Sequence, residues 1–277
     1  MSSAAAVRLG IVAASLRVFA LSLAEMLRSR RTIFLALLVA SPVLLALAVR
    51  LSGDGVSTSL RVNGQGVAGA AAFGLMIWIL FVRFIVPVLG VFYGTGLIAD
   101  EVEDKTITYL FCRPIPRGAV LLGKYLAYVV CTTLVVLPAA MVLFFVLVPP
   151  AAVGALFPLL LKDLGILAIG LAVYGALFGL VGAVVKRPLV VGLVFALGWE
   201  PVALLFPGYL KRLTVAYYVQ ALVPHAMPPD APAGLLQVAF RDVPSPAFAL
   251  FCLVFALIAL LALAVGAVSR REYVLDQ

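Results

Sequence analysis

The amino-acid sequence predicts an all-α integral membrane protein. Of its 277 residues, 65% are hydrophobic and only 12% are charged, whereas an average soluble domain carries about 25% charged residues. A chain in lipid must satisfy its backbone hydrogen bonds internally, which helices do. Six apolar segments have at least 18 residues each, close to the roughly 20 that span a bilayer. They are residues 32–49, 70–98, 121–148, 164–185, 188–206 and 247–268, and we expect a single transmembrane domain over residues 1–277.

The N-terminal region, before the first segment, predicts an amphipathic helix. One face would carry Arg8, Ser15, Ser22 and Ser29, and another would carry Val7, Ile11, Ala14, Val18 and Leu21. A helix of this kind can lie in the membrane interface; the alternative is a plain helical extension of the first span. Arg17 interrupts the apolar run, which disfavours a cleaved signal peptide.

Basic residues set the predicted orientation. Six spans place both termini on one side, where the loops hold 13 Lys and Arg residues, against 6 on the opposite side. The positive-inside rule therefore puts both termini in the cytoplasm. The net charge of +8 does not indicate nucleic-acid binding, because the basic residues stand beside apolar spans and not on a polar face.

The longest outer segment lies between the fifth and sixth spans. It runs from Pro207 to Pro246 and is interrupted by proline. Between those breaks, Tyr209–Leu222 and Ala233–Val243 predict two short helices that rest on the membrane.

Charged residues are concentrated between the second and third spans, from Ile98 to Lys124. Asp100, Glu101, Glu103 and Asp104 predict the first turns of a helix, where the macrodipole favours acids. Apolar residues recur at helical spacing behind them, and Pro114 and Pro116 end the pattern. Arg117 and Lys124 then stand at the entry of the third span. The segment therefore predicts a short amphipathic helix on the cytoplasmic side.

Residues Gly118–Lys124, GAVLLGK, match the pattern G-x-x-x-x-G-K of a phosphate-binding loop. Such a loop needs Ser or Thr next, to hold Mg²⁺, and a preceding strand. Tyr125 follows here, the sequence predicts no preceding strand, and the residues after Tyr125 are apolar and enter the third span. We therefore expect no nucleotide site, cofactor or metal in this chain. The sequence also contains no H-E-x-x-H motif, paired carboxylates or nucleophile and base set, so we do not expect an enzyme.

The charged segment resembles the cytoplasmic connector of ABC-2-type transporter permeases. That family often shows a Glu, then Gly-Thr, a Leu-rich turn, Pro, Ser-Arg and a later Gly-Lys. The residues at matching intervals are Glu101, Thr106, Leu110, Pro114, Arg117, Gly123 and Lys124, with Lys105 and Pro116 in place of the usual Gly and Ser. The order of interfacial helix, six spans and outer helices is also similar.

The resemblance implies the membrane subunit of an ATP-driven exporter in a bacterial cytoplasmic (inner) membrane. Two permease chains, identical or homologous, would form the pore. Two copies of a separate ABC ATPase would carry ATP and Mg²⁺. The connector would be the coupling helix that docks on the ATPase, through Glu101, Thr106, Leu110, Pro114, Arg117 and Lys124, together with Glu103.

Other functions remain open at this stage. An ion-gradient-driven secondary transporter or channel would need buried ionisable groups, and only Arg83 and Glu200 lie deep in the spans. At about 1.5 Å per residue the two are within about one helical turn in depth. Our hypothesis is that they form an ion pair, within one subunit or between two, on the translocation path; the alternative is that Arg83 snorkels and Glu200 caps a helix break at Trp199-Glu200-Pro201.

A stripe of small residues marks the fourth span. Gly175 and Gly179 form a G-x-x-x-G motif, which lets two helices approach closely in lipid. The stripe predicts close helix packing, either within one subunit or between subunits.

Overall fold

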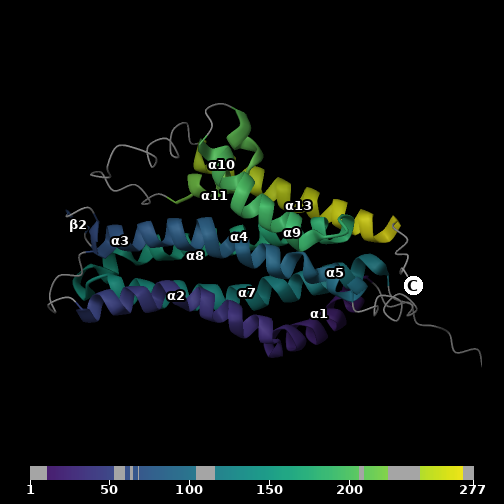
Figure 1. Cartoon of the computed structure of the whole chain (residues 1–277), viewed down its shortest axis with the longest axis horizontal. Helices are drawn as coiled ribbons and strands as arrows, with labels where there is room; N and C mark the ends of the chain where they lie inside the picture. The colour runs from purple at the N-terminus through teal and green to yellow at the C-terminus, as the bar shows by residue number, and fades with distance from the viewer. Residues whose placement is uncertain are drawn as a thin grey trace, which may run out of the picture.

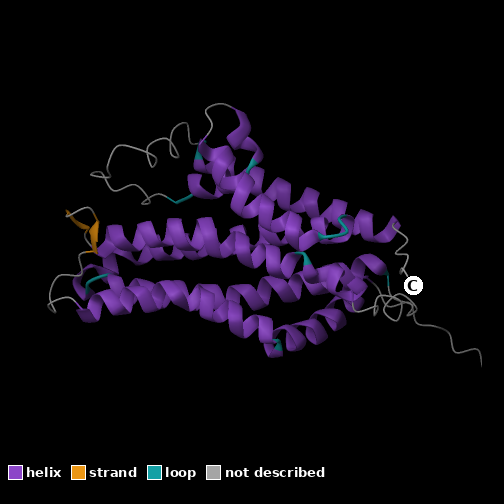
Figure 2. Cartoon of the chain, viewed as in Figure 1, coloured by secondary structure: helices purple, strands orange, loops and turns teal. Residues whose placement is uncertain are grey.

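The computed structural model describes residues 11–52, 60–62, 65–67, 69–103, 116–205, 209–223 and 244–270. Nearly all of these residues are helical, and most helices run along one long axis (Figure 1). Among the described residues, strand occurs in one antiparallel hairpin, β1 (Leu60–Val62) with β2 (Gln65–Val67), at one end of the bundle (Figure 2). The predicted all-α membrane class is confirmed.

Five helices in the described part are long and apolar enough to cross a membrane. Four of them are α2 (Arg30–Ser52), α7 (Arg117–Leu147), α8 (Pro150–Val184) and α13 (Pro246–Arg270). The remaining one, the predicted second span, is built from α3 (Gly69–Met76), η1 (Ile77–Ile85), α4 (Val86–Leu89), η2 (Gly90–Gly94) and α5 (Gly96–Glu103). Segments η1 and η2 are π-helical, and π-helical turns within α-helices are frequent at functional sites.

The predicted fifth span forms a shorter apolar helix over Pro188–Ala203. It consists of α9 (Pro188–Leu193), the π-helical η3 (Val194–Trp199) and α10 (Glu200–Leu205). The count of six spans therefore stays a prediction.

Helix α8 begins earlier than the sequence predicts. Instead of a span from 164, one continuous helix starts at Pro150. Pro149 is extended (φ −61°, ψ 143°) and Pro150 occupies the first turn, where its fixed φ suits a helix. With 35 residues the helix is about 52 Å long, which exceeds the roughly 30 Å hydrocarbon core.

Helix α1 (Ile11–Arg28) packs against α7 and is separated from α2 by a break at Ser29 (Figure 1). Its Ser15 and Ser22 are buried, whereas Leu16 and Leu21 are 55% and 71% exposed. The side with Ser15 and Ser22, and with Ala14 at 1% exposed, therefore meets the bundle, and Leu16, Arg17 and Leu21 point outward. This arrangement suits a helix lying in the interface, a placement that stays a prediction.

Tyrosines of α7 attach it to α8. Tyr125 and Tyr128 donate hydrogen bonds to the carbonyls of Ala172 (2.9 Å) and Leu171 (2.8 Å). Because lipid gives little hydrophobic drive for helix association, such bonds and close packing hold membrane helices together. At the other end of α7, the Arg50 guanidinium donates to the Val146 carbonyl at 2.9 Å and ties α2 to α7.

The first predicted outer helix is present as two short pieces, η4 (Tyr209–Leu213) and α11 (Val215–Ala221). Helix α11 packs against α13, α8 and η1. The second, Ala233–Val243, lies outside the described residues.

Candidate functional site

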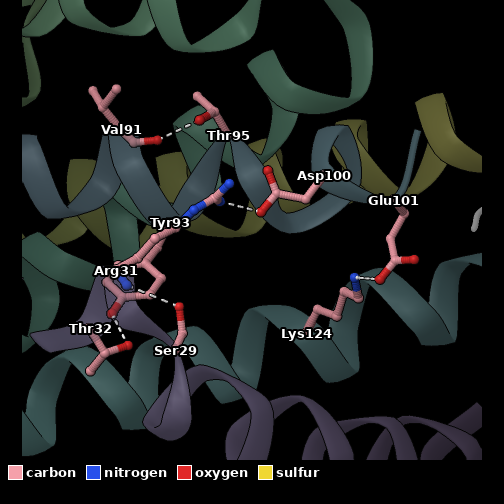
Figure 3. Close-up of polar contacts among 9 residues, drawn as sticks. All are labelled: Ser29, Arg31, Thr32, Val91, Tyr93, Thr95, Asp100, Glu101 and Lys124. Atoms are coloured by element: carbon pink, nitrogen blue, oxygen red, sulfur yellow. Dashed lines mark hydrogen bonds and ion pairs between the residues drawn. The ribbon is translucent and has the colours of Figure 1, made fainter. Parts of the chain in front are cut away.

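The end of α5 is joined to two neighbouring helices by ion pairs (Figure 3). Glu101 of α5 pairs with Lys124 of α7, and only 18% and 11% of their side chains are exposed. Asp100 pairs with Arg31 of α2 at 2.5 Å, and this pair is more open, at 40% and 61% exposed. Adjacent carboxylates of one helix thus bind bases of two different helices.

The turn between α1 and α2 lies beside these ion pairs. The Thr32 hydroxyl bonds to the Met26 carbonyl and lies 2.5 Å from the Tyr93 hydroxyl of η2. The Arg31 amide donates to Ser29 Oγ at 3.2 Å. These contacts fix the base of α2 to both the N-terminal helix and the second span (Figure 3).

The position of the acids corrects one sequence expectation. Asp100, Glu101 and Glu103 do not open a separate helix, because α5 continues the second span through Glu103. The acids therefore lie toward the C-terminal end of the spanning helix, where the macrodipole disfavours them. The basic side chains of Arg31 and Lys124 offset that unfavourable position.

The remaining predicted coupling residues are only partly described. Arg117 is exposed at the first residue of α7. Glu103 is the last described residue of α5, without a described side chain. Thr106, Leu110 and Pro114 lie outside the described residues. The structure thus brings together Glu101 and Lys124, at the two helix ends that flank the connector.

A second polar region lies further along the bundle, around Glu200. This carboxylate is 3% exposed. It accepts a hydrogen bond from the Tyr174 hydroxyl of α8 and another, at 3.1 Å, from the Val215 amide. Since Val215 is the first residue of α11, Glu200 caps this outer helix from a neighbouring one, as side-chain oxygens at helix N-termini do.

Arg83 lies in η1 with its guanidinium over the Trp78 ring, 5.9 Å from the ring centroid. Its Nη1 is buried and has no hydrogen-bond partner among the described residues. Within that part of the chain, the ion pairs do not include one between Arg83 and Glu200. The hypothesis of a pair between two subunits stays untested.

Tyr174 and Val215 are hydrogen-bond partners of Glu200 that the sequence did not predict. A tyrosine in a stripe of small residues gave no sign that it would meet a carboxylate 26 positions away. The alternative that Glu200 caps a break in its own helix is wrong, because the helix continues from η3 through Glu200 into α10, and Glu200 caps the start of α11.

The small-residue stripe of α8 lies against helices of the same chain. A Cβ on Gly175 would come within 1.9 Å of the Tyr128 ring, and one on Gly179 within 3.3 Å of Leu97. Both glycines therefore allow close approach inside one subunit.

Fold and site together define a helical multi-span membrane protein in which charged groups join the spans at one end of the bundle. Residues 16–272 match the family described as ABC-2 family transporter protein, and the chain belongs to this family. It is accordingly an integral membrane permease subunit of an ABC transporter. No curated protein sequence matches the chain.

Proposed function

We propose that the chain is the permease of an ATP-driven exporter, coupled to a separate ATPase through the connector between α5 and α7. Two permease chains, identical or homologous, would form the pore, with two copies of the ATPase beneath them. Both termini would be cytoplasmic, in a bacterial inner membrane. The observation that supports this most is the two ion pairs that join Asp100 and Glu101 of α5 to α2 and α7.

The proposed mechanism follows from the position of these ion pairs at the end of α5 and near the start of α7. A force on the connector acts on α5 and on the start of α7. Because Glu101 and Lys124 join those two helices, they would move together, and Arg31 would carry α2 with them. Rigid-body displacement of packed helices is an established way to pass a local change over a long distance.

The experiment uses charge reversal on the Glu101–Lys124 pair. The chain is coexpressed with the ABC ATPase that we expect a neighbouring reading frame to encode, and the ATPase rate of the purified complex is measured. Glu101→Lys and Lys124→Glu should each lower the permease-dependent rate, because breaking a largely buried ion pair leaves an uncompensated charge. The double reversal should recover part of the loss.

Arg270→Gln serves as a control, since Arg270 is an exposed base at the end of α13. A double variant no better than the worse single variant would contradict a coupling role for the pair. Tight ATP binding by the permease alone would contradict the whole proposal.

A secondary transporter is the competing function, and the buried Glu200 and half-buried Arg83 are the observations in its favour. Proteoliposomes that contain the chain without ATPase distinguish the two. Ion-gradient-driven flux that Glu200→Gln abolishes would support the competing function, and its absence supports the exporter.

A further inference from the structure

Two cavities meet at the Arg31–Asp100 ion pair. A smaller one of about 230 Å³ lies toward α1 and α7, and its lining includes Glu25, Glu101 and Lys124. A larger one of about 540 Å³ lies between α2, α5 and α9. Arg31 and Asp100 line both. The ion pair therefore lies between a cavity lined by charged residues and a second cavity lined mainly by apolar residues.

The larger cavity is apolar apart from the ion pair and one threonine. Phe34 and Leu35 of α2, Phe92 of η2 and Leu189 of α9 line it. Leu35 is 3% exposed, whereas Phe34 and Leu189 are 63% and 41% exposed, so the cavity extends from the core to the outer surface of the helices. Its volume falls within the roughly 300–1,000 Å³ of small-molecule sites.

One basic side chain, that of Arg31, lines the polar end of this cavity. Only Nη1 of Arg31 contacts Asp100, and a guanidinium has five N–H donors, which leaves others for a second acceptor. Lys186 and Arg187 are exposed and directly precede the lining residue Pro188. Arg31 therefore keeps donors for an anion at the cavity, and Lys186 and Arg187 carry further positive charge at the start of α9.

We propose that the cavity binds an anionic phospholipid. The phosphate would accept hydrogen bonds from Arg31, and an acyl chain would lie against Phe34, Leu35, Phe92 and Leu189. The polar and apolar parts of the site match the two parts of this ligand. In the proposed orientation the polar end faces the cytoplasmic leaflet, where anionic lipids attract basic residues near the surface.

The test measures lipid retention by the full-length chain. Purified protein is equilibrated with equal amounts of phosphatidylglycerol and phosphatidylcholine of matched chains, and retained lipid is identified by native mass spectrometry. We expect wild type to retain phosphatidylglycerol in preference by about fivefold, the effect of one basic residue near an anionic surface. Arg31→Gln should bring the ratio close to one.

Two variants separate lipid binding from the ion pair and from general surface charge. Asp100→Asn breaks the same ion pair but keeps the Arg31 charge, so it should preserve or increase the preference. Arg28→Gln removes an exposed base of α1 outside this cavity, and it should leave the ratio unchanged.

Equal retention of the two lipids by wild type would overturn the proposal. So would an Asp100→Asn ratio as low as that of Arg31→Gln, because the ion pair would then act only on structure. Displacement of phosphatidylglycerol by millimolar inorganic phosphate would indicate a site for free anions and would also overturn it. None of these outcomes depends on the ATPase or on transport.

Discussion

Replacing Gly175 by alanine should weaken the contact between α7 and α8. The added Cβ would lie 1.9 Å from one carbon of the Tyr128 ring and 2.7 Å from two others. The ring has little freedom to move away, because it is fully buried and its hydroxyl is bound to the Leu171 carbonyl. Either the ring or the helix must shift, and the hydrogen bond is strained in both cases.

The magnitude follows from a comparison within one helix. Overpacking costs about 1–3 kcal/mol, whereas alanine in place of glycine in a helix interior gains about 1 kcal/mol. Gly165 is also in α8, and a Cβ there would meet nothing within 4 Å. Because both variants share the propensity gain, Gly175→Ala should be less stable than Gly165→Ala by about 1–3 kcal/mol, the cost of the clash.

The assay is unfolding of the purified chain in mixed micelles with increasing sodium dodecyl sulfate, followed by tryptophan fluorescence. Tyr128→Leu removes the ring and should reduce the Gly175→Ala penalty in a double-mutant cycle. Tyr128→Phe keeps the ring, so the penalty should persist. Equal stabilities for Gly175→Ala and Gly165→Ala would refute the reasoning.

Three further predictions concern other contacts. Gly123→Val should loosen the packing of α1 on α7, because a Cβ there would come within 2.6 Å of the Ser15 carbonyl oxygen. Limited proteolysis should then cut α1 faster than in wild type, whereas the control Gly266→Val, where a Cβ would meet nothing within 4 Å, should leave the cutting rate unchanged. Glu200→Leu should speed amide exchange in α11 more than Glu200→Gln, which keeps one acceptor for the Val215 amide. In a cysteine-free background, cysteine at exposed position 209 should react with impermeant reagent from outside, and cysteine at exposed position 186 only after lysis. Labelling of position 186 in intact cells would contradict the orientation.

The sequence predicted the class of fold because lipid imposes simple rules on composition and length. The ends of helices were harder to predict where charged residues lie inside a helix. Lys162 and Asp163 resemble a membrane boundary in sequence, yet α8 passes through both. Lys162 is exposed while Asp163 is 1% exposed, so one helix presents the two charges to different surroundings. Hydropathy along the chain does not distinguish an exposed charged residue from a buried one.

The site was predictable in outline but not in its pairing. The charged segment and its bases were evident from sequence, and Glu101 and Lys124 were both named. Their contact joins positions 23 apart, and Arg31 meets Asp100 across 69 residues. Such pairs depend on how three helices are arranged, which no local pattern records. The acids were assigned to a new helix because macrodipole reasoning considers one helix at a time.

Polar contacts occur near the middle and at one end of the second span, and close packing lies between them. Near the middle Arg83 lies over Trp78, and at the end of α5 Asp100 and Glu101 bind neighbouring helices. Between them, η2 meets α8 through Gly90 and Gly94, where an added Cβ would come within 2.7 and 2.9 Å of α8 side chains. A contact this close resists sliding, because interiors packed without voids do not deform continuously. Under the proposed function, a push on α5 would therefore move the second span and α8 as one body, and relative motion would have to occur at other contacts of the bundle.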